Sequence, residues 1–231
     1  MVARPARAPE TTALKRVVRI GVGLALLVVL GFLFLRTVRG TRAEPYSIAP
    51  GNLGPWTLTI VSGARPNEPM LLLRPPPELM SGLFDQLFKR AMESMGQPAL
   101  PGIPLVLQGE LTRAQAGHPT LAPESVMAAA REAGLDSLSP KPICVAHRRT
   151  TTGGDRQQLY FAIFEAPAVG RFRQRLAAQW NDDVAPPAAF DPALVSPALI
   201  VAMVESSVER WLPLHADPKV DCVAPIVVSG N

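Results

Sequence analysis

Cysteine is scarce in this chain of 231 residues, which contains only Cys144 and Cys222. The two lie far apart in the sequence. Neither is part of a C-x-x-C pair or of the close cysteine–histidine spacing that holds structural zinc. A zinc site is therefore not expected, and the two cysteines can either form one disulfide or remain as two free, buried thiols.

Catalytic and nucleotide-binding motifs are also lacking. Ser206 and Ser207 do not have the G-x-S-x-G setting of a hydrolase nucleophile. Gly153-Gly154 opens no predicted helix whose first turn could hold a phosphate. We therefore expect no cofactor and no metal, and an enzymatic role is disfavoured.

Positive charge is missing from most of the chain, although the net charge is +4. Residues 1–43 contain eight of the 23 Lys and Arg residues and only one acidic residue. The remainder contains 15 basic and 18 acidic residues, a net charge of −3. Nucleic-acid binding requires a basic surface that neutralises phosphates, so no nucleic-acid partner is expected. Arg greatly outnumbers Lys, a bias typical of a GC-rich bacterial genome.

The run from Ile20 to Leu35 contains no charged or polar residue. A helix from Val17 to Leu35 would be roughly 28 Å long, close to the ~30 Å hydrocarbon core of a bilayer. We therefore predict a transmembrane helix over residues 17–36 that acts as a signal anchor in the lipid bilayer. The alternative is a cleaved signal peptide, for which Thr41-Arg42-Ala43 would be a poor cleavage site.

Basic residues flank this run unequally. Five precede it and three follow it: Arg4, Arg7, Lys15, Arg16 and Arg19, then Arg36, Arg39 and Arg42. The side richer in basic residues usually stays in the cytoplasm. We predict a single-pass protein of the cell (inner) membrane, with a cytoplasmic basic tail over residues 1–16. A Pro/Gly-rich linker (37–55) would then lead to one periplasmic domain (56–231).

An exported domain with two cysteines favours a disulfide between Cys144 and Cys222. Such a bridge would close a loop of roughly 80 residues, and loop-closure reasoning gives it at most roughly 4 kcal/mol of stabilisation. It requires the two Cα atoms to lie within about 7 Å of each other. Two buried free thiols are the alternative.

Hydrophobic periodicity predicts an α+β domain. Strands are predicted over residues 56–61, 70–73, 103–111, 142–149, 158–165, 198–205 and 222–228. Helices are predicted over residues 79–95, 123–133 and 167–180, with a helical turn over 207–212. From residue 103 to 205 the order is β-α-β-β-α-β, which predicts a ferredoxin-like unit followed by an extra terminal strand. Pro225 indicates that this last strand lies at a sheet edge.

His147 and Arg149 are the candidate ligand-binding residues. Alternation along the strand 142–149 places them on the face opposite Cys144 and Arg148. A histidine beside an arginine could bind an anion or a carboxylate. The alternatives are an exposed sheet face and a histidine that is hydrogen-bonded by a neighbouring side chain.

A Met/Phe face runs along the predicted helix 79–95. Its members are Met80, Phe84, Phe88 and Met92. Met and Phe side chains adapt to varied apolar partners, so this face could be a partner groove or a membrane-facing surface. The breadth of the apolar stripe instead favours packing in the core, which is the outcome we expect.

Three arginines, Arg171, Arg173 and Arg175, form a local cluster in the predicted helix 167–180. A spacing of two residues distributes side chains around the outside of a helix. We therefore expect a solvated face here rather than an anion site.

Together these features predict a membrane-anchored extracytoplasmic protein of the cell envelope. An anchor joined to a domain without recognisable chemistry favours a scaffold or interaction domain in an envelope or secretion assembly, with an envelope protein as its partner. The alternative is a small-molecule- or lipid-binding domain, or an envelope enzyme, with a site in the 103–205 unit. An apolar cavity ringed by a few convergent polar groups would favour this alternative.

Overall fold

The computed structural model describes residues 21–33, 44–152, 155–181 and 189–230. The chain divides into two compact units, residues 1–43 and residues 44–231. In the first unit, residues 21–33 form a helix. The predicted cytoplasmic tail, and both ends of the predicted segment 17–36, lie outside the described residues.

Across the part of the chain that the structure describes, no helix has both the length and the apolar character needed to cross a bilayer.

The second unit is an α+β domain, as expected. Its described strands are β1 (Tyr46–Ile48), β2 (Thr57–Ile60), β3 (Pro69–Arg74), β4 (Ile103–Leu107), β5 (Lys141–Thr152), β6 (Asp155–Glu165), β7 (Ala198–Val204) and β8 (Cys222–Val228). Its described helices are α2 (Pro77–Ala91), α3 (Gln108–Gly117), α4 (Pro123–Glu132), α5 (Pro167–Trp180), α6 (Val208–Trp211) and α7 (Pro218–Asp221). Single 3-10 turns are η1 (Pro50–Leu53) and η2 (Leu135–Ser137).

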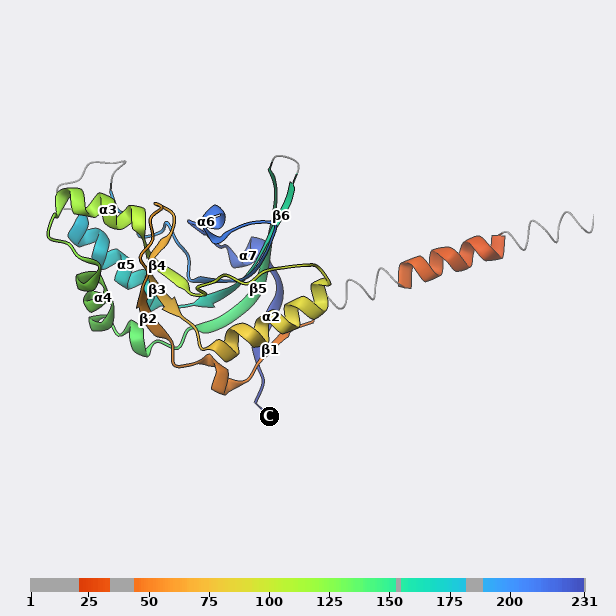
Figure 1. Ribbon diagram of the computed structural model, residues 1–231. Helices are drawn as coiled ribbons and strands as arrows, with labels where there is room; N and C mark the ends of the chain where they lie inside the picture. Colours follow the sequence, from red (N-terminus) through yellow and green to blue (C-terminus); the bar gives the residue numbers. More distant parts are fainter. Residues whose placement is uncertain (1–20, 34–43, 153–154, 182–188, 231) are drawn as a thin grey trace, which may run out of the picture. The chain divides into compact units, whose positions relative to one another are not determined.

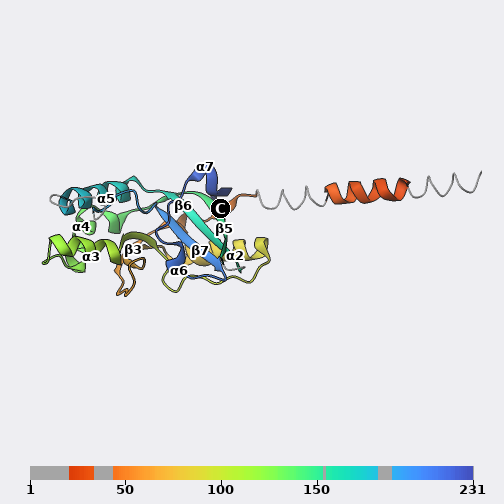
Figure 2. The same cartoon turned by 90° about the horizontal axis from the view of Figure 1, so that it is seen from above.

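These strands form two sheets. The larger has the order β1-β8-β5-β6-β7, and the smaller has the order β2-β3-β4. Within the domain, α3, α4 and α5 gather at the end occupied by the smaller sheet, whereas β1 and α2 lie at the other end (Figure 1). The same division is visible from above (Figure 2).

Both faces of the larger sheet carry apolar side chains, because successive residues of a strand point to opposite sides. Val145 and Tyr160 contribute to the main core, which also contains the buried faces of α2 and α5. Ala146 and Phe161 contribute to a second apolar cluster on the opposite face of the sheet. This cluster also contains Leu212 and Leu214. The hairpin of β5 and β6 therefore forms the partition between the two cores.

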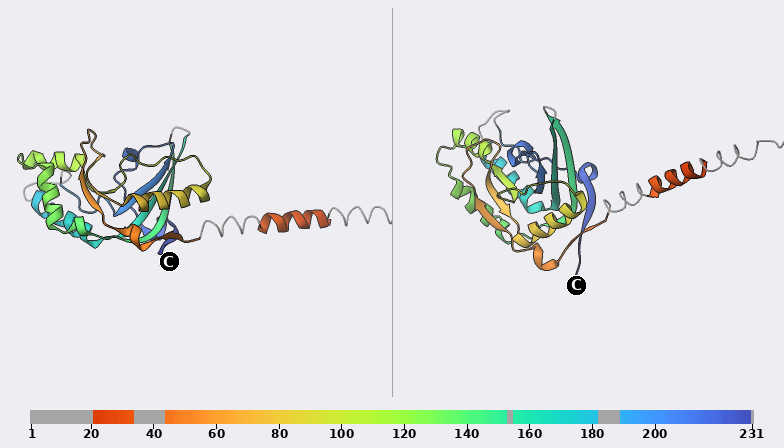
Figure 3. Two further views of the ribbon diagram at one scale, coloured as in Figure 1. Left: turned by 60° about the horizontal axis from the view of Figure 1, so that its bottom comes forward. Right: turned by 45° about the vertical axis from the view of Figure 1, so that its right-hand side comes forward.

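The β5–β6 hairpin is longer than its neighbours and projects beyond them (Figure 3). Its register runs from Lys141 opposite Glu165 to Thr152 opposite Asp155. Cross-strand partners share a face, so residues along the outer half of the hairpin form two rows of paired side chains. The predicted turn residues Gly153 and Gly154 lie outside the described residues.

The expected ferredoxin-like pairing is not formed. In that topology β4 would lie in the same sheet between β6 and β7, but β6 pairs directly with β7, and β4 pairs with β3 in the smaller sheet. Pro104 lies within β4 and has no N–H to donate. A strand with an internal proline suits an edge, and β4 lies at the edge of its three-stranded sheet.

The terminal strand β8 is not an edge, contrary to the expectation from Pro225. Residues 222–225 of β8 pair with β5, and residues 226–228 pair in parallel with β1. Pro225 is the last residue of β8 that pairs with β5, and pairing with β1 begins at Ile226. Its missing N–H therefore falls at the boundary between the two pairings rather than inside either one. Strand β1 lies within the segment 37–55 that the sequence predicts as a linker.

Two predicted elements end earlier than expected. The strand predicted over residues 103–111 ends at Leu107, where α3 begins. The Glu110 carboxylate accepts the Leu107 N–H at 2.8 Å, so an acidic side chain in the first turn stabilises the start of the helix. The helix predicted over residues 79–95 ends at Ala91, and Met92 caps it in the left-handed conformation with φ 53°.

Candidate functional site

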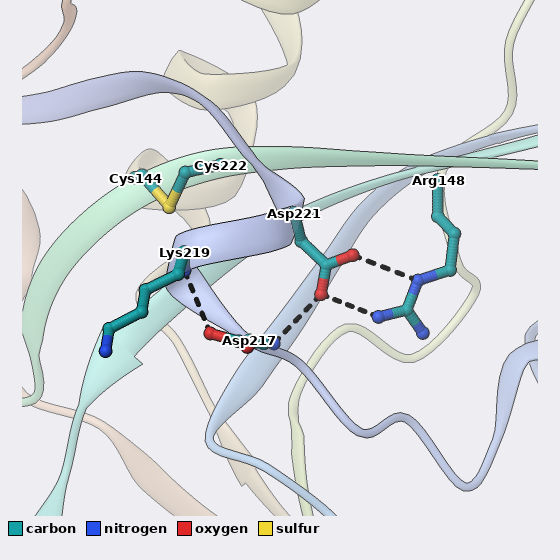
Figure 4. The surroundings of a disulfide bond; sticks show 6 residues. All are labelled: Cys144, Arg148, Asp217, Lys219, Asp221 and Cys222. Atoms are coloured by element: carbon teal, nitrogen blue, oxygen red, sulfur yellow. Dashed lines mark hydrogen bonds and ion pairs between the residues drawn. A yellow bond between two sulfur atoms is a disulfide. The ribbon is translucent and has the colours of Figure 1, made fainter.

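The two cysteines form a disulfide, which confirms the predicted bridge. Cys144 on β5 and Cys222 at the start of β8 have Cα atoms 5.7 Å apart and are separated by 78 residues in sequence. The bond therefore joins the last strand of the domain to its central hairpin (Figure 4). No free thiol remains for metal binding or catalysis, because these are the only cysteines of the chain.

A bidentate ion pair lies next to the disulfide (Figure 4). Arg148 donates from Nε to Asp221 Oδ1 at 3.2 Å and from a terminal nitrogen to Oδ2 at 2.6 Å. Asp221 Oδ2 also accepts the Asp217 N–H at 2.9 Å. Burial works to raise the pKa of Asp221, but the hydrogen bonds from Arg148 and Asp217 outweigh it and hold that pKa below its ordinary value. This pair links α7 to β5. Because its pKa is lowered, Asp221 is ionised at neutral pH and is a weak proton acceptor.

His147 and Arg149 lie on the opposite face of β5 from Cys144 and Arg148, as alternation predicts. Their cross-strand partners on β6 are Tyr160 and Gln158. The His147 ring stacks on the Tyr160 ring, with centroids 4.3 Å apart and planes inclined by 10°. His147, one member of the predicted ligand-binding pair, therefore packs on an aromatic ring that belongs to the main core.

Gln158 is the centre of the polar cluster that forms around this pair. Its Oε1 accepts from Arg149 Nε at 3.0 Å and lies 2.9 Å from His147 Nε2, a hydrogen bond when that nitrogen carries the ring proton. Its Nε2 donates to Glu93 Oε2 at 2.6 Å. The reverse amide orientation would face the amide nitrogen to a guanidinium and the oxygen to a carboxylate, so the neighbours determine which way Gln158 points.

This hairpin cluster (His147, Arg149, Gln158, Tyr160 and Glu93) borders two clefts. One has a volume of about 280 Å³ and is lined by Glu93, Arg149, Gln158 and the end of the hairpin, including Arg156. The other, of about 710 Å³, is lined by Glu93 to Gly96, by Arg156 and Gln158, and by Met203 to Glu205. Guanidinium, amide and carboxylate groups therefore converge on one place at the end of the sheet.

The hairpin cluster brings together a guanidinium, an amide and a carboxylate. Among the described residues no group of three or more His, Cys, Asp and Glu side chains is arranged to hold a metal ion. A guanidinium and a carboxylate on opposite sides of one amide suit a ligand that carries both signs of charge. Glu93 comes from the segment after α2 and was not part of the predicted site, because nothing local in the sequence links it to the hairpin 65 residues later.

The Met/Phe face of α2 changes character along the helix. Met80 is buried, and Phe84 is half-buried and packs against the main core. Phe88 is 49% exposed and Met92 is 88% exposed. The buried side of the helix is instead completed by Leu79, Leu83 and Leu87. The expected core packing therefore holds for the first half of the face, and its second half lies in solvent.

Arg173 is buried, contrary to the solvated face expected for all three arginines of α5. Only 1% of Arg173 is exposed, and it forms a bidentate pair with Glu110 at distances of 2.7 and 3.2 Å. Its remaining donors reach the carbonyl oxygens of Leu105, Pro192 and Asp191. The pair joins α5 to α3 and to the segment before β7, and with every donor satisfied it is a structural element rather than a site.

Comparisons with known proteins add no assignment to this geometry. No family model matches the chain, no curated protein matches it, and no solved structure matches it.

Proposed function

We propose that this chain is a single-pass protein of the inner membrane whose extracytoplasmic α+β domain serves as a scaffold or interaction domain in an envelope assembly. Residues 17–36 would anchor it in the bilayer, with the N-terminal tail in the cytoplasm. The partner would be another envelope protein. The first support is the apolar run from Ile20 to Leu35 together with the excess of basic residues before it.

The observation that carries the proposal is the Cys144–Cys222 disulfide. Disulfides form and persist in oxidising compartments and are rare in the cytoplasm. The basic tail and the apolar run together resemble an export signal. The disulfide of the domain suits the oxidising compartment outside the cytoplasm. The two observations come from different parts of the molecule and favour the same placement.

Contacts within the domain support an interaction role over a catalytic one. The buried or half-buried charged pairs, Arg173 with Glu110 and Arg148 with Asp221, are fully engaged in holding elements together. The side chains of the hairpin cluster are hydrogen-bonded to one another through Gln158. Among the described residues, Phe88 and Met92 are two exposed apolar side chains at the end of one helix, α2, which suits a surface that meets other molecules.

Topology mapping tests this proposal. A reporter that is active only outside the cytoplasm, fused after Asn231, should be active, and a reporter that is active only in the cytoplasm should be silent at that position. The matched control places the same two reporters before Met1, where the pattern should be reversed. Activity of the cytoplasmic reporter after Asn231 would refute the localisation.

A second candidate function is binding of a small molecule by the domain. The observation in its favour is the convergence of Arg149, Gln158 and Glu93 beside a cleft of about 280 Å³. A ligand of mixed charge that binds only the folded domain would raise the melting temperature of the wild-type protein, and the rise would increase with ligand concentration. Arg149→Ala should abolish that rise, whereas Lys141→Ala, at the far end of the same strand, should leave it unchanged.

A further inference from the structure

We propose that the C-terminal end of α2 is a membrane-contact surface, on which Phe88, Lys89 and Met92 rest against the bilayer that holds residues 17–36. This inference rests on the proposed anchoring and deepens it, because it states which side of the domain faces the lipid. The occupant is the bilayer surface itself, whose interfacial region accepts apolar side chains and attracts basic ones.

Two large apolar side chains are exposed at this end of α2 although the rest of its apolar stripe is buried or half-buried. Phe88 is 49% exposed and Met92 is 88% exposed. Met92 also caps the helix with φ 53°, and its N–H donates to Phe88 O at 3.1 Å. Glycine or asparagine suits a left-handed cap better. The chain thus has a bulky apolar side chain at a strained backbone position where it adds no packing to the domain.

The same end of α2 is attached to the place where the chain enters the domain. The two terminal nitrogens of Arg90 donate to the carbonyl oxygens of Glu44 and Pro45, and its guanidinium lies 4.0 Å from the centroid of the Tyr46 ring. One turn earlier, the Gln86 amide accepts the Ser47 N–H at 2.9 Å and donates to the Ser47 carbonyl at 2.8 Å. In Figure 1 the last turns of α2 lie beside β1.

The length of the connecting chain brings this surface within reach of the membrane. Only residues 36–43 separate the apolar run from Glu44. Eight residues span at most about 29 Å, however they are folded. The entry point of the domain is therefore held close to the bilayer, and the end of α2 is bonded directly to that entry point. Lys89, which follows Phe88 in the sequence, is also exposed and carries the positive charge that anionic lipids attract.

The test is photolabelling of the full chain in liposomes of phosphatidylethanolamine and phosphatidylglycerol. A small fraction of the lipid carries a photoreactive group in the upper part of its acyl chain, and labelled peptides are identified by mass spectrometry. We expect label in the peptide that contains residues 20–35 and in the peptide that contains residues 84–92. In the variant with Phe88→Asp and Met92→Asp the second label should fall by about tenfold, because insertion of two large apolar side chains is worth at least that factor.

Leu100→Asp provides the matched control. Leu100 is 46% exposed, so this variant also replaces an exposed apolar side chain with a charge, but Leu100 lies just before β4 of the smaller sheet, away from β1 and β8. Labelling in this variant should equal that of the wild type. In every variant the circular dichroism spectrum and the urea-unfolding transition should remain close to those of the wild type, which shows that the domain is folded.

The outcomes separate the two proposals. Label in residues 20–35 without label in α2 would overturn the membrane-contact surface and leave the anchoring intact. Absence of label in residues 20–35 would refute the anchoring, and the contact surface with it. Label in α2 that survives the double substitution, or that falls equally in Leu100→Asp, would also overturn this inference.

Discussion

Replacing Arg173 with methionine should strongly destabilise the domain. Arg173 is 1% exposed and donates to both oxygens of the Glu110 carboxylate. Methionine fills a similar volume but leaves Glu110 as a buried carboxylate without its counter-ion. Breaking a buried ion pair from one side costs about 3–5 kcal/mol. Domains of this size have total stabilities of about 5–15 kcal/mol, so the loss is a large fraction of the total.

The assay is urea unfolding of the full chain in a mild detergent, followed by circular dichroism. Arg171→Met is the matched control, because Arg171 lies two residues earlier on the same helix and is exposed. It should change the free energy of unfolding by no more than about 0.5 kcal/mol. Any difference between the two variants then reports burial and pairing rather than the loss of an arginine from α5.

A double variant tests whether the effect comes from the unpaired carboxylate. Glu110→Leu combined with Arg173→Met removes both charges, and replacing a whole buried pair by apolar residues is often close to neutral. The double variant should therefore be more stable than Arg173→Met alone, although three carbonyl oxygens and the Leu107 N–H lose their partners. Equal free energies of unfolding for Arg173→Met and Arg171→Met would refute a stabilising role for the buried pair.

Three further predictions concern the disulfide, its neighbouring ion pair and the Met/Phe face. Cys222→Ser should lower the free energy of unfolding by up to roughly 4 kcal/mol, measured by the same urea titration, and full alkylation of both thiols in the unreduced wild type would contradict it. The pKa of Asp221 is lower in the folded state, so its stabilisation is complete above its ordinary value of 3.8 and is lost as pH falls through the folded value. Melting temperatures of the wild type and Asp221→Asn should therefore differ at neutral pH and converge in acid, and a constant difference would refute the linkage. Phe84→Ala should cost about 2 kcal/mol, roughly half of the cost at a fully buried phenylalanine, and Phe88→Ala about 0.5 kcal/mol, with equal melting temperatures of the two variants as the contrary result.

The elements that local sequence determines were predicted closely. The helix predicted over residues 167–180 matches α5, because Pro167 suits a first helical turn and Val169, Phe172 and Leu176 recur at helical spacing. The β5–β6 hairpin was likewise expected from two apolar strands around a polar turn. The disulfide followed from the cysteine count and the inferred compartment rather than from local pattern.

Pairing between distant segments was not predictable in the same way. β4 has the apolar pattern of any buried strand, and nothing in that pattern distinguishes the expected position beside β6 from the observed pairing with β3. The placement of β1 beside β8 depends on Gln86, whose amide occupies both backbone groups of Ser47 and so covers the outer side of that strand. Arg173 differs from Arg171 only in which way it faces, and the charge pattern of α5 does not distinguish them.

Gln158 shows why a polar site is harder to predict than a core. A hydrophobic face is recognised from one element, because burial imposes a period on its own residues. The hairpin cluster instead depends on one amide that accepts from Arg149 and donates to Glu93, two residues that lie 56 positions apart in sequence. Gln158→Glu would keep the shape of that side chain but oppose one carboxylate to another, so it should lower the melting temperature at neutral pH, and Glu93→Gln in the same chain should reverse much of that loss. Restoration of the Gln158→Glu melting temperature by Glu93→Gln would show that the two carboxylates meet, and no restoration would show that Gln158 contributes to the cluster only through its contacts on β5.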